Sequence, residues 1–226
     1  MARAPDLTLY LVTDPELCAE RGVVATAVAA VRGGATCVQL RNKSAPEAAL
    51  RREAAALLAA LRPLGAPLLV NDRIEVAAAV GADGAHLGQE DGDPAAARRL
   101  LGDAAVLGLS VQTEDHARAV DPGAVDYVGT GAVFATATKP GRTAPIGVEG
   151  AARLKRLSRL PAVAIGGIDA GSAGGLVAAG LDGVAVVSAI CGASDPEVAA
   201  RTIRAAIDQA RIARAALPPT LRDETP

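Results

Sequence analysis

Polar side chains in this chain collect directly after short apolar runs, and their types suit the binding of phosphorylated molecules. The first cluster has the sequence QLRNK at residues 39–43. Side chains alternate along a strand, so Gln39, Arg41 and Lys43 would point to one side. Two cations beside an amide suit a multiply charged anion, because arginine offers a planar fork and lysine a compact point charge. A solvated basic strand end explains this motif alone equally well.

Two carboxylates follow the next two apolar runs. Asp72 stands in the pair Asn71-Asp72, and Asp91 ends the segment GQED at residues 88–91. On neighbouring strand ends that face cations, both carboxylates could hold a Mg²⁺ that bridges to phosphate oxygens, since this ion needs few protein ligands. Asp72 as the N-cap of a helix starting at Arg73, and Asp91 as a plain loop residue, are the alternatives. Their joint position beside one anion site favours the metal.

Small and hydroxylated residues later in the chain predict a second phosphate site. The long loop over residues 129–141 carries Thr136 and Thr138 shortly before Lys139, which is one of three lysines in the chain. Gly166-Gly167 leads into a predicted helix, where free backbone N–H groups and the helix dipole can receive a phosphate. Ser188 follows the last apolar run and adds a hydroxyl. Together, the charged cluster of residues 39–91 and the small, hydroxylated residues after 129 imply two bound ligands. A diphosphate with a metal ion would lie at one side of the site and a monophosphate at the other.

The apolar runs that position these residues alternate with longer stretches rich in Ala, Leu and Arg. This alternation predicts repeated βα units rather than separate α and β domains. Eight units in about 210 residues fit an α/β fold, a single-domain TIM (β/α)8 barrel over residues 1–213, with residues 214–226 as a frayed tail. An open doubly wound sheet is the competitor, but Thr13-Asp14-Pro15 stands where its glycine-rich fingerprint belongs. The strands are expected at 7–12, 36–40, 67–70, 84–87, 105–110, 125–129, 162–165 and 183–187.

Local signals mark the ends of the intervening helices. Ser44 and Ser194, each followed three residues later by Glu, predict capping boxes, and Asp93 before a proline predicts a further N-cap. Gly81 and Gly180 stand where helices should end.

Composition narrows the class of protein. The 226 residues carry a formal net charge of −2, and half of them are hydrophobic, which is enough for one sizeable core. Near-neutral charge and a scarcity of aromatic residues exclude a general nucleic-acid binder. Three cysteines without a close pair along the chain predict a reducing compartment. The sequence contains neither a signal peptide nor a membrane-spanning run, so we expect a cytoplasmic protein. Its expected partners are phosphorylated small molecules, and a homo-oligomer is compatible with the sequence.

Several residues are expected to be structural. His86 alternates with apolar neighbours, which favours a hydrogen-bonded interior histidine over a catalytic base. Cys37 and Cys191 are expected to be small buried hydrophobes. The pair Arg98-Arg99 is expected on a solvated helix face.

A series of motifs follows the strand order along nearly the whole chain. These are QLRNK at 39–43, ND at 71–72, GAHLGQED at 84–91, the strand end at Ser110, TATK at 136–139, AIGGI at 164–168 and VVSAI at 186–190. The series resembles the thiamine-phosphate synthase family. That resemblance implies a TIM barrel that joins hydroxymethylpyrimidine diphosphate to hydroxyethylthiazole phosphate with Mg²⁺, forming thiamine phosphate and pyrophosphate. It also implies that the diphosphate departs first, leaving a pyrimidine-methyl cation that the thiazole nitrogen captures.

The resemblance assigns the site residues by position. The pyrimidine diphosphate would be bound by Gln39, Leu40, Arg41, Asn42, Lys43, Asn71, Ser110 and Lys139. Of these, the catalytic residues would be Arg41, Lys43, Ser110 and Lys139. The thiazole phosphate would be bound by Thr136, Ala137, Thr138, Gly167, Val187 and Ser188, and Mg²⁺ by Asp72 and Asp91.

The chain departs from the family pattern at a few positions. Asn42 stands where a Glu is frequent, which could change how the flanking cations are oriented, and Ala132 and Ala135 replace frequent prolines in a loop. Three alternatives stay open: a thiazole tautomerase of the same barrel family, a non-catalytic phosphate-binding barrel, and another barrel isomerase. The tautomerase would not need the two aspartates together with Lys139, and the isomerase would need a proton-transfer pair that the sequence does not offer.

Overall fold

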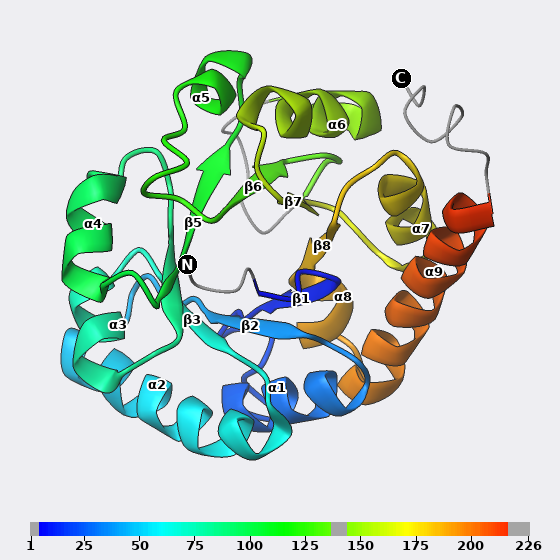
Figure 1. Ribbon diagram of the computed structural model, residues 1–226. Helices are drawn as coiled ribbons and strands as arrows, with labels where there is room; N and C mark the ends of the chain where they lie inside the picture. Colours follow the sequence, from blue (N-terminus) through cyan, green and yellow to red (C-terminus); the bar gives the residue numbers. More distant parts are fainter. Residues whose placement is uncertain (1–4, 137–143, 217–226) are drawn as a thin grey trace.

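Eight parallel strands close into one barrel in the computed structural model, which describes residues 5–136 and 144–216 (Figure 1). Each strand pairs with the next along the chain, and the eighth pairs with the first to close the ring. The strands are β1 (Leu9–Val12), β2 (Cys37–Leu40), β3 (Leu68–Asn71), β4 (Gly84–Leu87), β5 (Val106–Val111), β6 (Tyr127–Gly131), β7 (Ala162–Ile165) and β8 (Gly183–Val186). The predicted single-domain α/β barrel is confirmed, and the open sheet is excluded.

Helices surround the barrel as an outer ring (Figure 1). They are α1 (Val23–Arg32), α2 (Glu47–Leu61), α3 (Ile74–Val80), α4 (Pro94–Leu101), α5 (Glu114–Arg118), α6 (Gly147–Ser158), α7 (Ala170–Ala178), α8 (Ser188–Cys191) and α9 (Pro196–Ala216), with a short 3₁₀ helix at Arg62–Leu64. The last helix continues through residues 214–216, which the sequence analysis places in the tail. Among the described residues, none of these helices combines the length and apolarity that crossing a membrane requires.

Proline position decides where two helices begin. The carboxylate of Asp93 accepts N–H bonds from the first turn of α4, as predicted. The capping box at Ser44 is wrong: Pro46 is the N-cap of α2, because a proline forces the residue before it out of the helical region. The capping box at Ser194 is also wrong, since Asp195 directly precedes a first-turn proline and accepts the N–H bonds of α9 itself.

Polar side chains tie neighbouring strands together at the amino end of the barrel. The residue directly before β4, β6 and β8 is in each case an aspartate, Asp83, Asp126 or Asp182. Its carboxylate accepts an N–H bond of 2.7–2.8 Å from the start of the preceding strand. Thr36 does the same before β2, accepting the first N–H of β1 at 3.2 Å. These bonds fix the strand register at one end and leave the other end free for a site.

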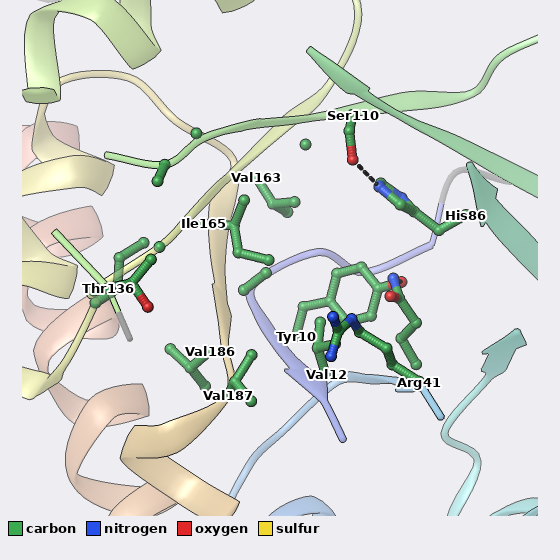
Figure 2. A pocket seen from close by; sticks show the side chains of 18 of the residues that line it. Tyr10, Val12, Arg41, His86, Ser110, Thr136, Val163, Ile165, Val186 and Val187 are labelled. Carbon is green, nitrogen blue, oxygen red and sulfur yellow. Dashed lines mark hydrogen bonds between the residues drawn. The ribbon is translucent and has the colours of Figure 1, made fainter. Parts of the chain in front are cut away.

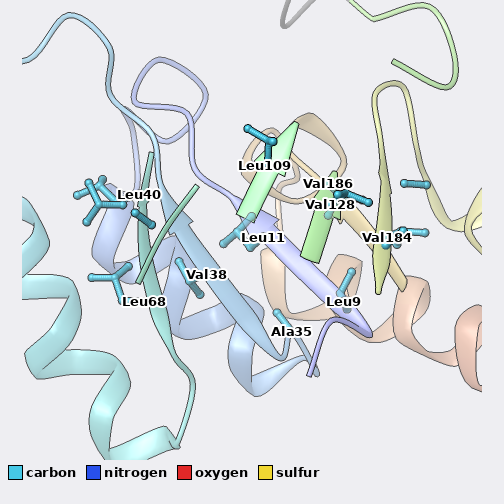
Figure 3. Packing of buried hydrophobic residues seen from close by; sticks show 14 of the residues in the cluster. Leu9, Leu11, Ala35, Val38, Leu40, Leu68, Leu109, Val128, Val184 and Val186 are labelled. Carbon is cyan, nitrogen blue, oxygen red and sulfur yellow. The ribbon is translucent and has the colours of Figure 1, made fainter. Parts of the chain in front are cut away.

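Two groups of buried side chains fill the molecule. The larger core lies between strands and helices, where Figure 3 shows Leu11, Val38 and Leu68 among its members. The smaller one lies inside the barrel and holds both tyrosines, Tyr10 and Tyr127. Gly108 makes room for the Tyr127 ring, because a Cβ at position 108 would stand 2.2 Å from the ring carbon Cζ.

The three cysteines are buried, as expected of Cys37 and Cys191. Folding nevertheless brings Cys18 and Cys191, which are far apart in the sequence, into thiol–thiol contact. The hydrogen bond from Cys191 lowers the pKa of Cys18 to about 6, although burial opposes this shift. The absence of a close pair therefore holds for the sequence and not for the fold.

Arg98 corrects one expectation. Its guanidinium donates to the carbonyl oxygens of Ala105 at 2.5 Å and Ala124 at 3.0 Å, and pairs with Asp126 at 2.6 Å, so it is not on a solvated face. Its neighbour Arg99 is 73% exposed, as expected. A helix-period pattern cannot distinguish the two, because the partners of Arg98 come from the segments before β5 and β6.

We expect Arg98→Met to lower the free energy of unfolding by about 2–4 kcal/mol, because the carbonyls of Ala105 and Ala124 lose the Arg98 donor and the Asp126 carboxylate loses its cation. Urea denaturation followed by circular dichroism measures the change. Arg99→Met is the matched control and should stay within about 0.5 kcal/mol of the unaltered protein. Equal denaturation midpoints for the two variants would contradict this role of Arg98.

Candidate active site

A cavity opens at the carboxyl ends of the strands, and every strand contributes to its lining. One wall, the polar side, comes from β2 to β5 and carries Gln39, Arg41, Asn71, His86 and Ser110. The opposite wall, the small-residue side, follows β6 to β8 and carries Thr136, Gly166, Gly167, Val187 and Ser188. Figure 2 shows Thr136 and Val187 across the cavity from Arg41 and His86. Eight of the predicted site residues thus line one cavity: Gln39, Arg41, Asn71, Ser110, Thr136, Gly167, Val187 and Ser188.

Arg41 presents an unusual cation to the cavity. Its side chain is only 15% exposed, and the nearest carboxylate, that of Asp14, lies 3.9 Å from its Nη1 atom. The Nε atom is buried and has no hydrogen-bond partner among the described residues. The backbone N–H of Arg41 donates to Thr13 Oγ1 at 3.0 Å, which holds the residue at the rim. A buried donor on a cation without a partner is costly, and an anionic ligand would satisfy it.

Three charged groups meet beside the polar side, as the sequence analysis predicts. Lys43 Nζ lies 2.7 Å from Asp72 Oδ2, and Asp91 Oδ2 accepts the Gly88 N–H at 2.7 Å. Burial raises the pKa of Asp91, and the adjoining Asp72 carboxyl raises it further, against the lowering effects of the Gly88 N–H and Lys43. Asp72 and Asp91 therefore lie close enough to repel each other when both are ionised.

The backbone at Asp72 aims its carboxylate. Its φ of 61° is left-handed, a conformation that only Gly, Asn and Asp adopt readily. The N-cap alternative is wrong, because Arg73 is the cap residue of α3 and no side chain caps that helix. Instead, the Asp72 N–H donates to the carbonyl oxygen of His86 at 2.9 Å, which ties the residue to the next strand.

The paired carboxylates suit a hard divalent cation. Mg²⁺ is commonly bound by one or two carboxylates, with water and substrate phosphates completing its shell. The like-charge proximity that raises the pKa of Asp91 is what such a cation would relieve. Among the described residues, no group of three or more His, Cys, Asp or Glu side chains is arranged to hold a metal. A cation here would thus need phosphate or water as its further ligands.

A buried relay of hydrogen bonds crosses the barrel interior. Gln39 Nε2 donates to the Tyr10 hydroxyl at 2.8 Å, and that hydroxyl lies 3.0 Å from the hydroxyl of Tyr127. The Tyr127 hydroxyl lies 2.8 Å from His86 Nδ1, and His86 Nε2 lies 2.9 Å from Ser110 Oγ, the bond drawn in Figure 2. His86 is a hydrogen-bonded interior residue, as predicted, but it also lines the cavity. The part of both tyrosines in this relay is not visible in the sequence, because their mid-strand positions resemble ordinary core positions.

Some predicted residues do not present their side chains to the cavity. Leu40 is buried in the core between strands and helices, because it follows Gln39 and faces the opposite way. Asn42 donates to Glu53 of α2 at 3.3 Å. Any substrate contact of these two residues would have to use the backbone. Ala137, Thr138 and Lys139 lie outside the described residues.

The expectation that Gly166-Gly167 leads to a helix start with free N–H groups needs a correction. The helix α7 begins at Ala170, and Asp169 caps its first N–H groups with its own carboxylate. The N–H groups of Gly171 and Ser172 are therefore already satisfied and do not await a phosphate. Gly167 still lines the cavity, and its left-handed φ of 66° lets the backbone pass close to Ala135, whose oxygen would lie 2.6 Å from a Cβ at position 167.

Comparisons with known proteins agree with this geometry. The family model described as thiamine monophosphate synthase matches residues 9–190. The thiamine-phosphate synthase of Azorhizobium caulinodans is 52% identical over 206 residues, covering 91% of this chain and 97% of that protein. That of Xanthobacter autotrophicus is 53% identical over 211 residues, covering 93% and 100%. The solved thiamine phosphate pyrophosphorylase from Pyrococcus furiosus superposes with a TM-score of 0.82 at 34% identity, covering 92% of this chain and 98% of that one. The chain therefore belongs to the thiamine-phosphate synthase family.

Proposed function

We propose that this protein condenses 4-amino-2-methyl-5-hydroxymethylpyrimidine diphosphate with hydroxyethylthiazole phosphate, giving thiamine phosphate and pyrophosphate. Family membership and near-complete coverage of relatives named thiamine-phosphate synthase support this function. The observation that carries the chemistry is the cluster of Lys43, Asp72 and Asp91, together with the buried cation of Arg41 in the cavity wall. Its partners are then phosphorylated small molecules, and a cytoplasmic location stays a prediction from composition.

We assign the polar side of the cavity to the pyrimidine diphosphate. Gln39, Asn71 and Ser110 would contact the pyrimidine part, and Arg41 and Lys43 the diphosphate. Lys139 remains a diphosphate ligand on its sequence motif alone. Asp72 and Asp91 would hold Mg²⁺, which when bound neutralises charge on the diphosphate oxygens.

The reaction proceeds by departure of the leaving group. The carbon–oxygen bond to the diphosphate breaks, and its electron pair leaves with the pyrophosphate. Arg41 and Lys43 supply positive charge where this negative charge develops, which lowers the barrier most in a site that excludes water. The thiazole nitrogen then gives its lone pair to the methylene carbon. That nitrogen has no proton to lose, so the reaction needs no general base.

We assign the small-residue side to the thiazole phosphate. Thr136 and Ser188 offer hydroxyls, and Gly167 and Val187 offer backbone there; Ala137 and Thr138 belong to the same proposal on their motif. Holding the phosphate at this wall positions the distant ring nitrogen beside the reacting carbon across the cavity. Binding energy is thereby converted into orientation.

The alternatives differ in the products they allow. A thiazole tautomerase would isomerise the thiazole phosphate and handle no diphosphate, and a silent phosphate-binding barrel would form no product. Neither has a use for the paired carboxylates beside Lys43. This cluster favours the synthase.

We expect the purified protein to form thiamine phosphate and pyrophosphate from the two precursors in the presence of Mg²⁺. Removal of Mg²⁺ with a chelator should lower the rate by about 100-fold or more, because the leaving group then loses its main source of neutralisation. Chromatography of the product and a pyrophosphate assay measure the two outputs. A rate unaffected by the chelator would contradict the metal assignment, and isomerised thiazole phosphate as the sole product would indicate the tautomerase.

A further inference from the structure

The buried relay reaches the cavity at both ends, through Gln39 and Ser110. Its two tyrosines are buried, with Tyr10 1% and Tyr127 0% exposed, and Tyr10 and His86 border the cavity from below its polar side. Each hydroxyl has a single proton, so the direction of one bond sets the direction of the next. Leaving a buried polar group without a partner costs more free energy than one hydrogen bond contributes. An arrangement in which one hydroxyl of the relay points the wrong way is therefore disfavoured.

The direction of the relay follows from its first bond. Gln39 donates to the Tyr10 hydroxyl, so that hydroxyl must give its own proton to a different neighbour, and Tyr127 is one candidate acceptor. The other neighbour of this hydroxyl is the thiol of Cys37, and sulfur is a weak acceptor. Donation from Tyr10 to Tyr127 is therefore favoured, and Tyr127 then donates to His86 Nδ1. The proton of a neutral His86 is consequently on Nε2, from which it is donated to Ser110 Oγ.

We infer that the buried relay is a positioning device for the pyrimidine ring: through Tyr10, Tyr127 and His86 it presents the Ser110 hydroxyl as a hydrogen-bond donor and the Gln39 carbonyl oxygen as an acceptor. This inference rests on the proposed function. An aminopyrimidine has ring nitrogens that accept and an amino group that donates, so the two ends of the relay match its polar atoms. Reversal of the relay would leave Ser110 offering lone pairs to a ring nitrogen, which repels them. Tyr10, Tyr127 and His86 are thus positioning residues, and none of them transfers a proton to substrate.

Kinetics of a double-mutant cycle test the inference. Tyr127→Phe removes one hydroxyl and keeps the ring, which fills the space over Gly108. The centroid of this ring lies 6.1 Å from the ring centroid of Tyr10. It should raise KM for the pyrimidine diphosphate about tenfold and leave KM for the thiazole phosphate within about twofold. In the Ser110→Ala background the same change should add less than about twofold, because the relay acts through Ser110. Independent, multiplying effects of the two substitutions would overturn the inference.

A matched control separates the relay from general damage to the barrel. Thr130 lies on β6 like Tyr127, is fully buried, and donates from its hydroxyl to a backbone carbonyl outside the relay. Thr130→Val should leave both KM values within about twofold of the unaltered protein. An equal rise of the pyrimidine KM in Thr130→Val and Tyr127→Phe would mean that strand packing, and not the relay, is responsible.

The tautomer of His86 provides a readout that needs no turnover. Nitrogen-15 NMR of the free protein should place the ring proton on Nε2, and Tyr127→Phe should shift the Nδ1 signal. A proton on Nδ1 would reverse the relay and overturn the inference. Failure of the unaltered protein to form thiamine phosphate would instead count against the proposed function, and the NMR result would be unaffected by it.

Discussion

Asp72→Asn should lower kcat/KM for the pyrimidine diphosphate by about 100- to 1,000-fold, because it removes a negative ligand from the proposed Mg²⁺ site. The change is nearly isosteric, and asparagine tolerates the left-handed backbone of this position as aspartate does. The amide oxygen can still accept from Lys43. The fold should therefore survive, and the loss should concern charge alone. Pyrophosphate release at saturating thiazole phosphate, measured over a range of Mg²⁺ concentrations, gives the effect.

Asp93→Asn is the control for this substitution. Asp93 caps α4 from the same segment that carries Asp91, and asparagine is an equally good N-cap, so both stability and turnover should be retained. Full turnover of Asp72→Asn at ordinary Mg²⁺ concentrations would show that the carboxylate pair does not serve the metal.

Arg41→Met should lower kcat/KM by about 100- to 1,000-fold while leaving the thermal midpoint unchanged or higher. The Arg41 guanidinium contributes little to the stability of the free protein: within the described parts of the chain, the Asp14 carboxylate is 3.9 Å away and the buried Nε atom has no hydrogen-bond partner. A methionine of similar length fills the same space without that cost. Steady-state kinetics and thermal unfolding, measured on one preparation, test both halves of the prediction.

Arg41→Lys distinguishes charge from shape at this position. Lysine keeps the positive charge and loses the planar fork, so it should recover part of the activity that methionine loses. Arg51→Met, on the exposed face of α2, is the control and should change neither quantity. A clear fall in thermal midpoint for Arg41→Met, proportional to the activity loss, would make Arg41 a structural residue.

The barrel could be predicted because its signals are local. Each strand is a short apolar run bounded by turn residues, and the expected ranges overlap all eight observed strands. Strand ends in a parallel barrel converge, so polar residues after separate runs, such as Arg41, Asn71 and Ser110, could be expected in one place.

The buried relay could not be predicted in this way. Inside the barrel, Tyr10 and Tyr127 are brought together from positions 117 residues apart, and only closure of the ring sets their contact. An alternating pattern identifies them as buried and says nothing about which hydroxyl meets which nitrogen. The environment of Arg98 escapes prediction for the same reason, since its acceptors come from the segments before β5 and β6.

The helix ends show a different limit. Ser44 and Ser194 match the spacing of a capping box, yet a proline two residues later sets where each helix begins. Before α7, two glycines predict a phosphate at the helix start, but the Asp169 carboxylate accepts the N–H bonds of Gly171 and Ser172 there. Where a capping-box spacing and a nearby proline predict different first residues of a helix, the steric restriction that proline places on the backbone decides where the helix begins.

The contact between Gly108 on β5 and the Tyr127 ring on β6 joins two positions in evolution. Any side chain at 108 would begin with a carbon 2.2 Å from the tyrosine ring and 2.4 Å from its hydroxyl oxygen. A lineage can therefore exchange the tyrosine for a smaller residue first and the glycine afterwards, but not in the opposite order. The residue allowed at position 108 therefore depends on the residue at position 127, and the two sites cannot vary independently.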